Sequence, residues 1–104
     1  MIFLVINLPG AILPLDRAER FEEPLENAFA AAGLHGHTVG GGTALGEVDG
    51  RKVITSCDIE FEVENWDEAL PLIRRVLIEA DAPATTTIRR YKPEYTVYRL
   101  HPEE

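Results

Sequence analysis

Acidic and apolar residues alternate along the stretch from Cys57 to Glu64, and this alternation could place carboxylates together for chemistry. A period of two is typical of a half-buried β-strand, so the acidic side chains share the face that points away from the core. Side chains two apart on that face lie roughly 7 Å from each other, a spacing that suits an acid–base pair. A solvated polar face is the alternative, and it is the one we favour. The carboxylates concerned are Asp58, Glu60, Glu62 and Glu64.

A run of glycines precedes the acidic stretch and exposes bare backbone. Glycine loses more backbone entropy than other residues and packs nothing inside a strand, so such a run needs a compensating role. A β-bulge that bends an edge strand is one such role, and close approach of a ligand or partner to the backbone is the other. No Lys-Ser or Lys-Thr follows the run, which excludes a phosphate-binding loop. The candidate binding residues here are Gly40, Gly41, Gly42 and Thr43.

Two histidines and one cysteine complete the reactive side chains of this region. A His-x-His pair such as His35 and His37 can bind zinc on a strand if Asp58 or Glu60 supplies a third ligand. The pair alone is a weak signal, so we predict neither a metal nor a cofactor. Cys57 falls in the apolar phase of its strand and is interpreted as a small buried hydrophobic side chain.

The composition limits the classes of protein and partner. The 104 residues predict one domain spanning 1–104, and 45% hydrophobic with 27% charged residues is typical of a packed globular chain. Eighteen acidic against ten basic residues give a net charge of −8, which disfavours nucleic acids and anionic membranes and favours a basic protein partner or simple solubility. The single Cys57 excludes an internal disulfide and predicts a reducing, cytoplasmic location. The apolar run 2–8 lacks a basic start and is interpreted as a buried strand, not a signal peptide.

Local signals predict the helices and strands that carry these residues. Pro24 is compatible with the first turn of a helix over 24–32, which Gly33 would end, while residues 16–22 form a separate turn. Asp49-Gly50 is a hairpin signal between strands over 37–47 and 53–64. A second helix opens at Asn65 with a capping box completed by Glu68, and Pro71 should kink it or move its start to Asp67. The remaining predicted strands cover 2–7, 85–91 and 95–100.

The resulting order is strand, helix, strand, strand, helix, strand, followed by a short C-terminal strand. It predicts an α+β protein with a ferredoxin-like βαββαβ sandwich, in which both helices cover one face of an antiparallel sheet. On the other face, Arg89 joins Tyr91 if Ile88 points to the core, and there Arg89 either binds an anionic ligand or, as we favour, pairs with the acidic strand. Strand 2–7 is apolar in both phases, so a second subunit or the strand 95–100 should cover part of that face.

Three segments carry a resemblance to known proteins. The motifs are Arg20-Phe21-Glu22-Glu23-Pro24-Leu25, Gly40-Gly41-Gly42-Thr43 and Cys57-Asp58-Ile59-Glu60. Together they resemble a set of short bacterial proteins without an established function, over residues 20–60. In size, acidity and layout the chain is also similar to small immunity proteins that neutralise toxins. The resemblance implies no catalytic residues.

Three classes of function remain in order of preference. The first is a non-catalytic interaction protein, immunity-like or regulatory, which uses the open sheet face to bind a protein partner or a second copy of itself. The second is a small-molecule-binding regulatory module, in which the glycine strand offers backbone donors and Arg89 a counter-charge. The third is a small hydrolase-like enzyme that combines His35 or His37 with Asp58 or Glu60.

Overall fold

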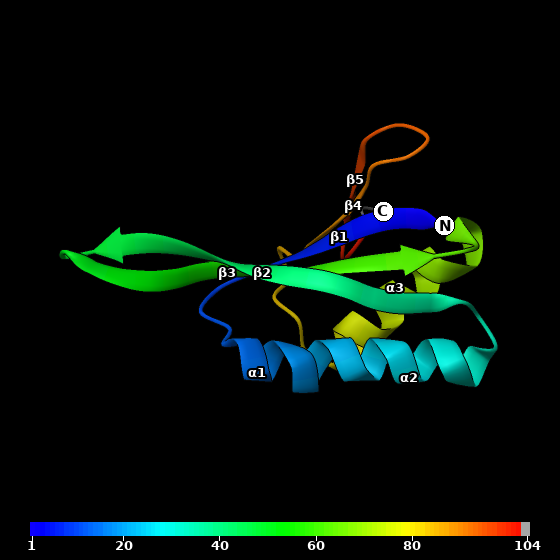
Figure 1. Cartoon of the computed structure of the whole chain (residues 1–104), viewed down its shortest axis with the longest axis horizontal. Helices are drawn as coiled ribbons and strands as arrows, with labels where there is room; N and C mark the ends of the chain where they lie inside the picture. Colours follow the sequence, from blue (N-terminus) through cyan, green and yellow to red (C-terminus); the bar gives the residue numbers. More distant parts are fainter. Residues whose placement is uncertain (103–104) are drawn as a thin grey trace.

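The computed structural model describes residues 1–102 as a five-stranded antiparallel sheet with helices on one side (Figure 1). The strand order is β2-β3-β1-β4-β5, and the fold is therefore α+β. The elements in chain order are β1 (Ile2–Pro9), α1 (Pro14–Arg17), a π-helical turn (Ala18–Glu22), α2 (Glu23–Ala32), β2 (Gly36–Val48), β3 (Arg51–Val63), α3 (Trp66–Glu79), β4 (Thr87–Arg90) and β5 (Thr96–Arg99).

The hydrophobic core lies between the sheet and the helices. Alternate residues of β1 and β3 point into it, and the Phe29 ring of α2 packs on Phe61 of β3 with ring centroids 5.2 Å apart. The predicted alternation is confirmed over Cys57–Val63, where every second residue is buried. The largest fully buried side chains are Leu4, Ile6, Leu8, Phe21, Leu25, Phe29, Ile59, Phe61, Ile73, Leu77, Ile88 and Leu100.

The first helical segment is longer than predicted, because α1, the π-helical turn and α2 follow one another without a break from residue 14 to 32. The predicted separate turn over 16–22 is therefore helical. Pro24 explains the π geometry: its ring crowds the carbonyl four residues earlier, and a wider turn relieves that contact. The amide of Glu23 accordingly donates to the carbonyl of Ala18, five residues back. Gly33 ends α2 in the left-handed conformation, with φ of 70°, as predicted.

The predicted cap of the second helix is confirmed, since the Asn65 side chain accepts from the Glu68 amide at 3.1 Å. The alternative that Pro71 moves the helix start to Asp67 was wrong: α3 begins at Trp66 and continues past the proline. Pro71 and Asp67 are both exposed. The carbonyl that loses its intrahelical donor therefore lies on the solvent side of the helix, where water can satisfy it.

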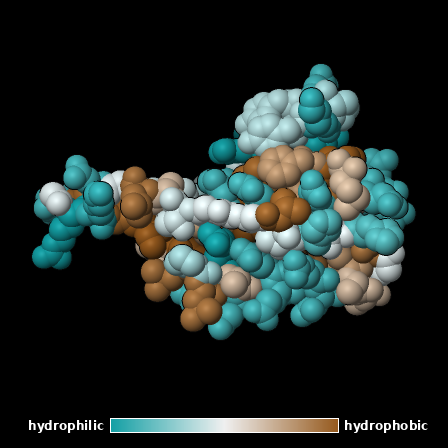
Figure 2. Space-filling model, viewed as in Figure 1, coloured by the Kyte–Doolittle hydropathy of each residue, from teal (hydrophilic) through white to brown (hydrophobic). Residues whose placement is uncertain are grey.

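The β2–β3 hairpin extends well beyond the body, and we call its outer part, residues 45–54, the arm (Figure 1). Asp49 and Gly50 turn it with positive φ, as the hairpin signal predicted. A register shift next to Thr55 makes Leu45 pair with Ile54, so the alternation predicted from Val53 onward holds only from Cys57. Figure 2 shows hydrophobic residues gathered where the arm joins the body. Exposed hydrophobic side chains on the elements involved are Leu13 and Leu15, at the start of α1, and Leu45, in the arm.

The last two strands are shorter than predicted, and β5 pairs edge to edge with β4. Aromatic and cationic side chains fasten them to α3, because Arg90 lies over the rings of Trp66 and Tyr98, which are themselves 5.2 Å apart. The expectation that strand 95–100 covers the sheet was wrong: β5 extends the sheet, and only the loop before it rises above the face opposite the helices (Figure 1).

Candidate functional site

The sheet face opposite the helices, here called the open face, carries three rows of side chains. Residues paired across antiparallel strands point to the same side, so the register defines each row. The first row contains His37, Glu62, Phe3 and Tyr91, the second Gly40, Glu60, Val5, Arg89 and Val97, and the third Gly42, Asp58, Asn7, Thr87 and Arg99. The acidic strand therefore lies between a glycine strand and an apolar one.

The three carboxylates of β3 differ in their surroundings. Asn7 donates to Oδ1 of Asp58 at 2.7 Å, and the Nε2 atom of His37 lies 3.6 Å from Oε1 of Glu62. Glu60, in the middle, makes neither a hydrogen bond nor an ion pair with residues 1–102. It is half-buried beside Val5, which is only 9% exposed. A half-buried carboxylate without a partner gains most from an incoming cation.

The glycines of β2 serve different neighbours on the two faces of the sheet. A Cβ at Gly40 would lie 2.6 Å from Oε1 of Glu60, so this glycine makes room for the carboxylate on the open face. A Cβ at Gly41 would lie 2.8 Å from the carbonyl oxygen of Asp58 and 3.1 Å from Cζ of Arg17. A Cβ at Gly42 would meet nothing within 4 Å. A register shift between Thr38 and Gly40 supplies the bulge considered from the sequence.

Arg17 is the residue that the sequence analysis missed. Its guanidinium lies against Gly41 on the helix side, and its Nη1 donates to the carbonyl of Gly42 at 3.0 Å. Its Nε also donates to Oε2 of Glu22 at 2.8 Å, which completes an ion pair. Gly41 thus makes room for an arginine from α1. The sequence does show an arginine upstream of three consecutive glycines. No local pattern, however, indicates that this arginine contacts those glycines.

A second helix side chain reaches the outer edge of β2. Oε2 of Glu26 accepts a hydrogen bond from the Thr38 amide at 3.0 Å. Together with Arg17 at Gly42, it satisfies backbone groups that an edge strand would otherwise leave open to another chain. The edge beside the helices is therefore protected by side chains of opposite charge.

Aromatic rings cover the apolar part of the open face. The Tyr91 ring packs between Phe3 and Tyr95, with centroid distances of 5.8 and 5.2 Å. The apolar content of β1 is thus covered within the chain, which weakens the argument for a covering second subunit.

Arg89 lies on the open face, as expected from the burial of Ile88. Within the described part of the chain it forms no ion pair with the acidic strand, because Val5 lies between it and Glu60.

The two histidines do not have the arrangement that the zinc hypothesis requires. His35 precedes β2 and lies by a cavity of about 230 Å³ with Glu64 and Glu68, so the two rings do not share one strand. His37 pairs with Glu62, not with Asp58 or Glu60. Across residues 1–102, no group of three or more His, Cys, Asp and Glu side chains gathers in a way that could hold a metal ion.

Cys57 lies on the helix side of the sheet and is 1% exposed, which agrees with its interpretation as a buried hydrophobic residue. Burial raises the pKa of its thiol, the nearby Asp58 and Glu22 add to that effect, and Arg17 opposes it. A thiol with a raised pKa is a poor nucleophile at neutral pH. The site therefore offers cation-binding and stacking groups, with no activated thiol among them.

Gly41 faces the helix side of the sheet, whereas Glu60 and Arg89 lie on the open face, so these three residues do not line one pocket. Comparison of the chain with protein families, with curated proteins and with solved structures finds no match. None of the helices within residues 1–102 is long and apolar enough to cross a membrane.

Proposed function

We propose that this protein is a non-catalytic binding module that docks a basic protein partner on its open face. The observation that carries the proposal is Glu60, a half-buried carboxylate at the centre of the face without a partner among residues 1–102. A lysine or arginine of a partner would supply the missing counter-charge. The net charge of −8 would steer such a partner toward the surface.

The surroundings of Glu60 support docking of a protein segment. On one side the glycine strand presents backbone without side chains at Gly40 and Gly42, so another chain can approach closely. On the other side lie Tyr91 and Tyr95, which are 39% and 57% exposed. Exposed tyrosines beside a charged centre are typical of protein interfaces, where they provide apolar area and a hydroxyl.

The arrangement of the polar groups favours binding over catalysis. Asp58 is held by Asn7, and the carboxylate of Glu62 lies beside His37. An acid–base mechanism needs groups that converge on one substrate atom. Here the carboxylates follow one strand in a line, which suits a row of contacts with an extended or helical partner.

The test compares two double charge reversals. One variant combines Glu60→Lys with Glu62→Lys on the open face, and the control combines Glu19→Lys with Glu23→Lys on the exposed side of the first helical segment. The immobilised proteins are incubated with a cell extract at low and high salt, and captured proteins are identified. We expect a basic protein that the wild type and the control retain at low salt and the open-face variant loses. Equal retention by both variants would refute the proposal.

We also propose that the fold is a ferredoxin-like βαββαβ sandwich extended by β5. The support is that helices follow β1 and β3, and that β1 lies between β3 and β4. We further propose that the protein is related to the short bacterial proteins and the immunity proteins that its sequence resembles. We also propose that it is located in the cytoplasm. The buried free thiol of Cys57 is compatible with a reducing compartment.

A further inference from the structure

The arm, residues 45–54, projects from the body with no other element packed on it. The molecule measures 46 × 27 × 27 Å, and the arm forms one end of its long axis (Figure 1). None of its ten residues is buried. The last pair between β1 and β3 joins Pro9 to Ser56, so within the arm β2 and β3 have only each other as strand neighbours. A two-stranded ribbon without a covered face is marginally stable in water, so this arm would gain stability from a partner.

The arm carries apolar side chains on both of its faces. Leu45 and Ile54 form one cross-strand pair and therefore share a face. Successive pairs alternate between the faces, so Val48 and Val53 lie on the other one. Leu45 is 61% exposed and Val48 is 57% exposed. A ribbon surrounded by water has no use for apolar side chains on either face, so the pattern indicates a surface that another chain covers.

The outer edges of the arm also differ from the edge of the body. Beside the helices, Glu26 and Arg17 hydrogen-bond to the backbone of β2 at Thr38 and Gly42. Within residues 1–102 this protection of β2 by helix side chains ends before the arm begins. A free edge with apolar side chains is a template for pairing with another strand. The same hairpin is thus closed to pairing at the body and open to it in the arm.

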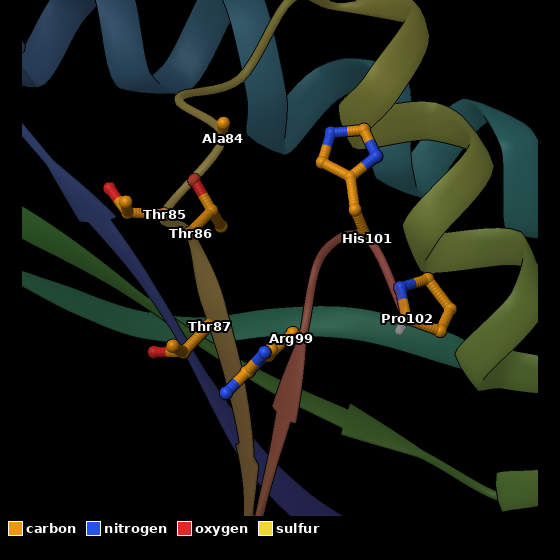
Figure 3. A pocket seen from close by; sticks show the side chains of 7 residues that line it. All are labelled: Ala84, Thr85, Thr86, Thr87, Arg99, His101 and Pro102. Atoms are coloured by element: carbon orange, nitrogen blue, oxygen red, sulfur yellow. The ribbon is translucent and has the colours of Figure 1, made fainter. Parts of the chain in front are cut away.

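A projecting hairpin can also act as a lid over a cavity, but the cavities of this molecule lie elsewhere. Three cavities of about 630, 410 and 230 Å³ have no residue of the arm among their described lining. Figure 3 shows the first of them, between the threonines of 84–87 and the side chains of Arg99 and His101. The arm is therefore available for contact with another chain.

The charge of the arm favours a second copy of this chain as its partner. The arm contains two acidic and two basic residues, Glu47, Asp49, Arg51 and Lys52, so the rest of the chain carries the whole net charge of −8. With five residues on each strand at about 3.3 Å each, the arm spans roughly 16 Å. Arms that overlap in opposite directions keep the two acidic bodies that far apart, beyond the Debye length of about 8 Å at physiological ionic strength. A neutral arm offers no comparable attraction to a basic protein.

We propose that the arm is a dimerisation element. Two copies lay their arms side by side in opposite directions around a two-fold axis, so that free strand edges pair and neighbouring apolar side chains pack together. The tip of each arm then lies beside the base of the other, where Leu13 and Leu15 are also exposed. Pairing at the edges leaves the open face around Glu60 accessible, so the dimer is independent of the docking role.

The first test measures the mass of the protein by sedimentation equilibrium over a range of concentrations. We expect the wild type to change from monomer to dimer as its concentration rises. Leu45→Lys and Val48→Lys should each weaken dimerisation at least about tenfold, because a two-fold interface contains each substitution twice and each replaces apolar contact by a charge. Ile78→Lys, at a side chain of α3 that is 44% exposed, is the matched control and should leave the dissociation constant unchanged.

The second test uses the wild type alone and so does not depend on the folding of a variant. Amide hydrogen exchange is compared at low and high protein concentration. We expect amides within residues 45–54 to exchange more slowly in the dimer, and amides of β5, the other outer strand, to keep their rates.

A wild type that stays monomeric at every concentration would overturn the proposal, and so would equal dimerisation by the wild type, Leu45→Lys and Val48→Lys. Slower exchange confined to β5 or to the helices would overturn it as well, because the contact would then lie outside the arm.

Discussion

Replacing Gly41 by alanine adds one methyl group at the contact between β2 and the Arg17 side chain. The new Cβ would lie 2.8 Å from the carbonyl oxygen of Asp58, which belongs to the backbone of the sheet and cannot withdraw. It would also lie 3.1 Å from Cζ of Arg17, whose guanidinium donates to Gly42 and Glu22. The substitution therefore both crowds the sheet and displaces a side chain with two hydrogen bonds.

The magnitude follows from three effects. Overpacking in a well-packed region costs about 1–3 kcal/mol, and weakening a hydrogen bond of a partly buried charged group costs about 1 kcal/mol. Alanine also restricts the unfolded chain, which returns about 0.4–1 kcal/mol. For Gly41→Ala we expect a net loss of about 2 kcal/mol in the free energy of unfolding. For a domain of this size that corresponds to a fall of about 8–16 °C in Tm.

Gly42→Ala is the matched control, because no atom lies within 4 Å of its added Cβ. Only the effect on the unfolded chain remains, so we expect this variant to be unchanged or up to about 1 kcal/mol more stable. Urea unfolding followed by the fluorescence of Trp66, the single tryptophan, measures both variants. If Gly41→Ala and Gly42→Ala unfolded at the same urea concentration, the assignment of Gly41 to the Arg17 contact would be wrong.

Three further outcomes are expected. Asn65→Ala removes the acceptor that caps α3 and should cost about 1 kcal/mol in urea unfolding, whereas Asn65→Asp keeps an acceptor and should retain most of the stability. Burial raises the pKa of the Cys57 thiol in the folded chain, so the unfolded thiol ionises first as pH rises past its ordinary pKa of 9.0. The free energy of unfolding should therefore fall above that pH. If Cys57→Ala lost as much stability over the same pH range as the wild type, this explanation would be wrong. Glu26→Ala frees the Thr38 amide at the edge of β2 and should increase self-association in sedimentation experiments, while Glu23→Ala serves as the control and an equal increase there would contradict the edge argument.

Features set by local interactions could be predicted from the sequence. The Asn65 cap, the left-handed Gly33 and the Asp49-Gly50 turn each depend on a few neighbouring residues, and all three were identified correctly. The burial of Cys57 followed from the alternation of its own strand. In each case the physical cause lies within a few positions of the residue concerned.

Features that depend on distant contacts could not be predicted in the same way. Gly41 is explained by Arg17, which lies more than twenty positions earlier and reaches this glycine only after the helix packs on the sheet. The bulge at Thr55 reverses the side on which Ile54 lies, and alternation alone gives no sign of it.

The position of β1 in the sheet has a consequence for how the chain folds during synthesis. β1 precedes the other strands of this sheet along the chain, yet it lies between β3 and β4, whose residues follow it by roughly fifty and eighty positions. Its two backbone edges therefore stay unpaired until β3 and then β4 have been translated. Such long-range pairing slows folding and exposes a nascent strand to other chains. Both edges of β1 are therefore paired only after β4 has been made.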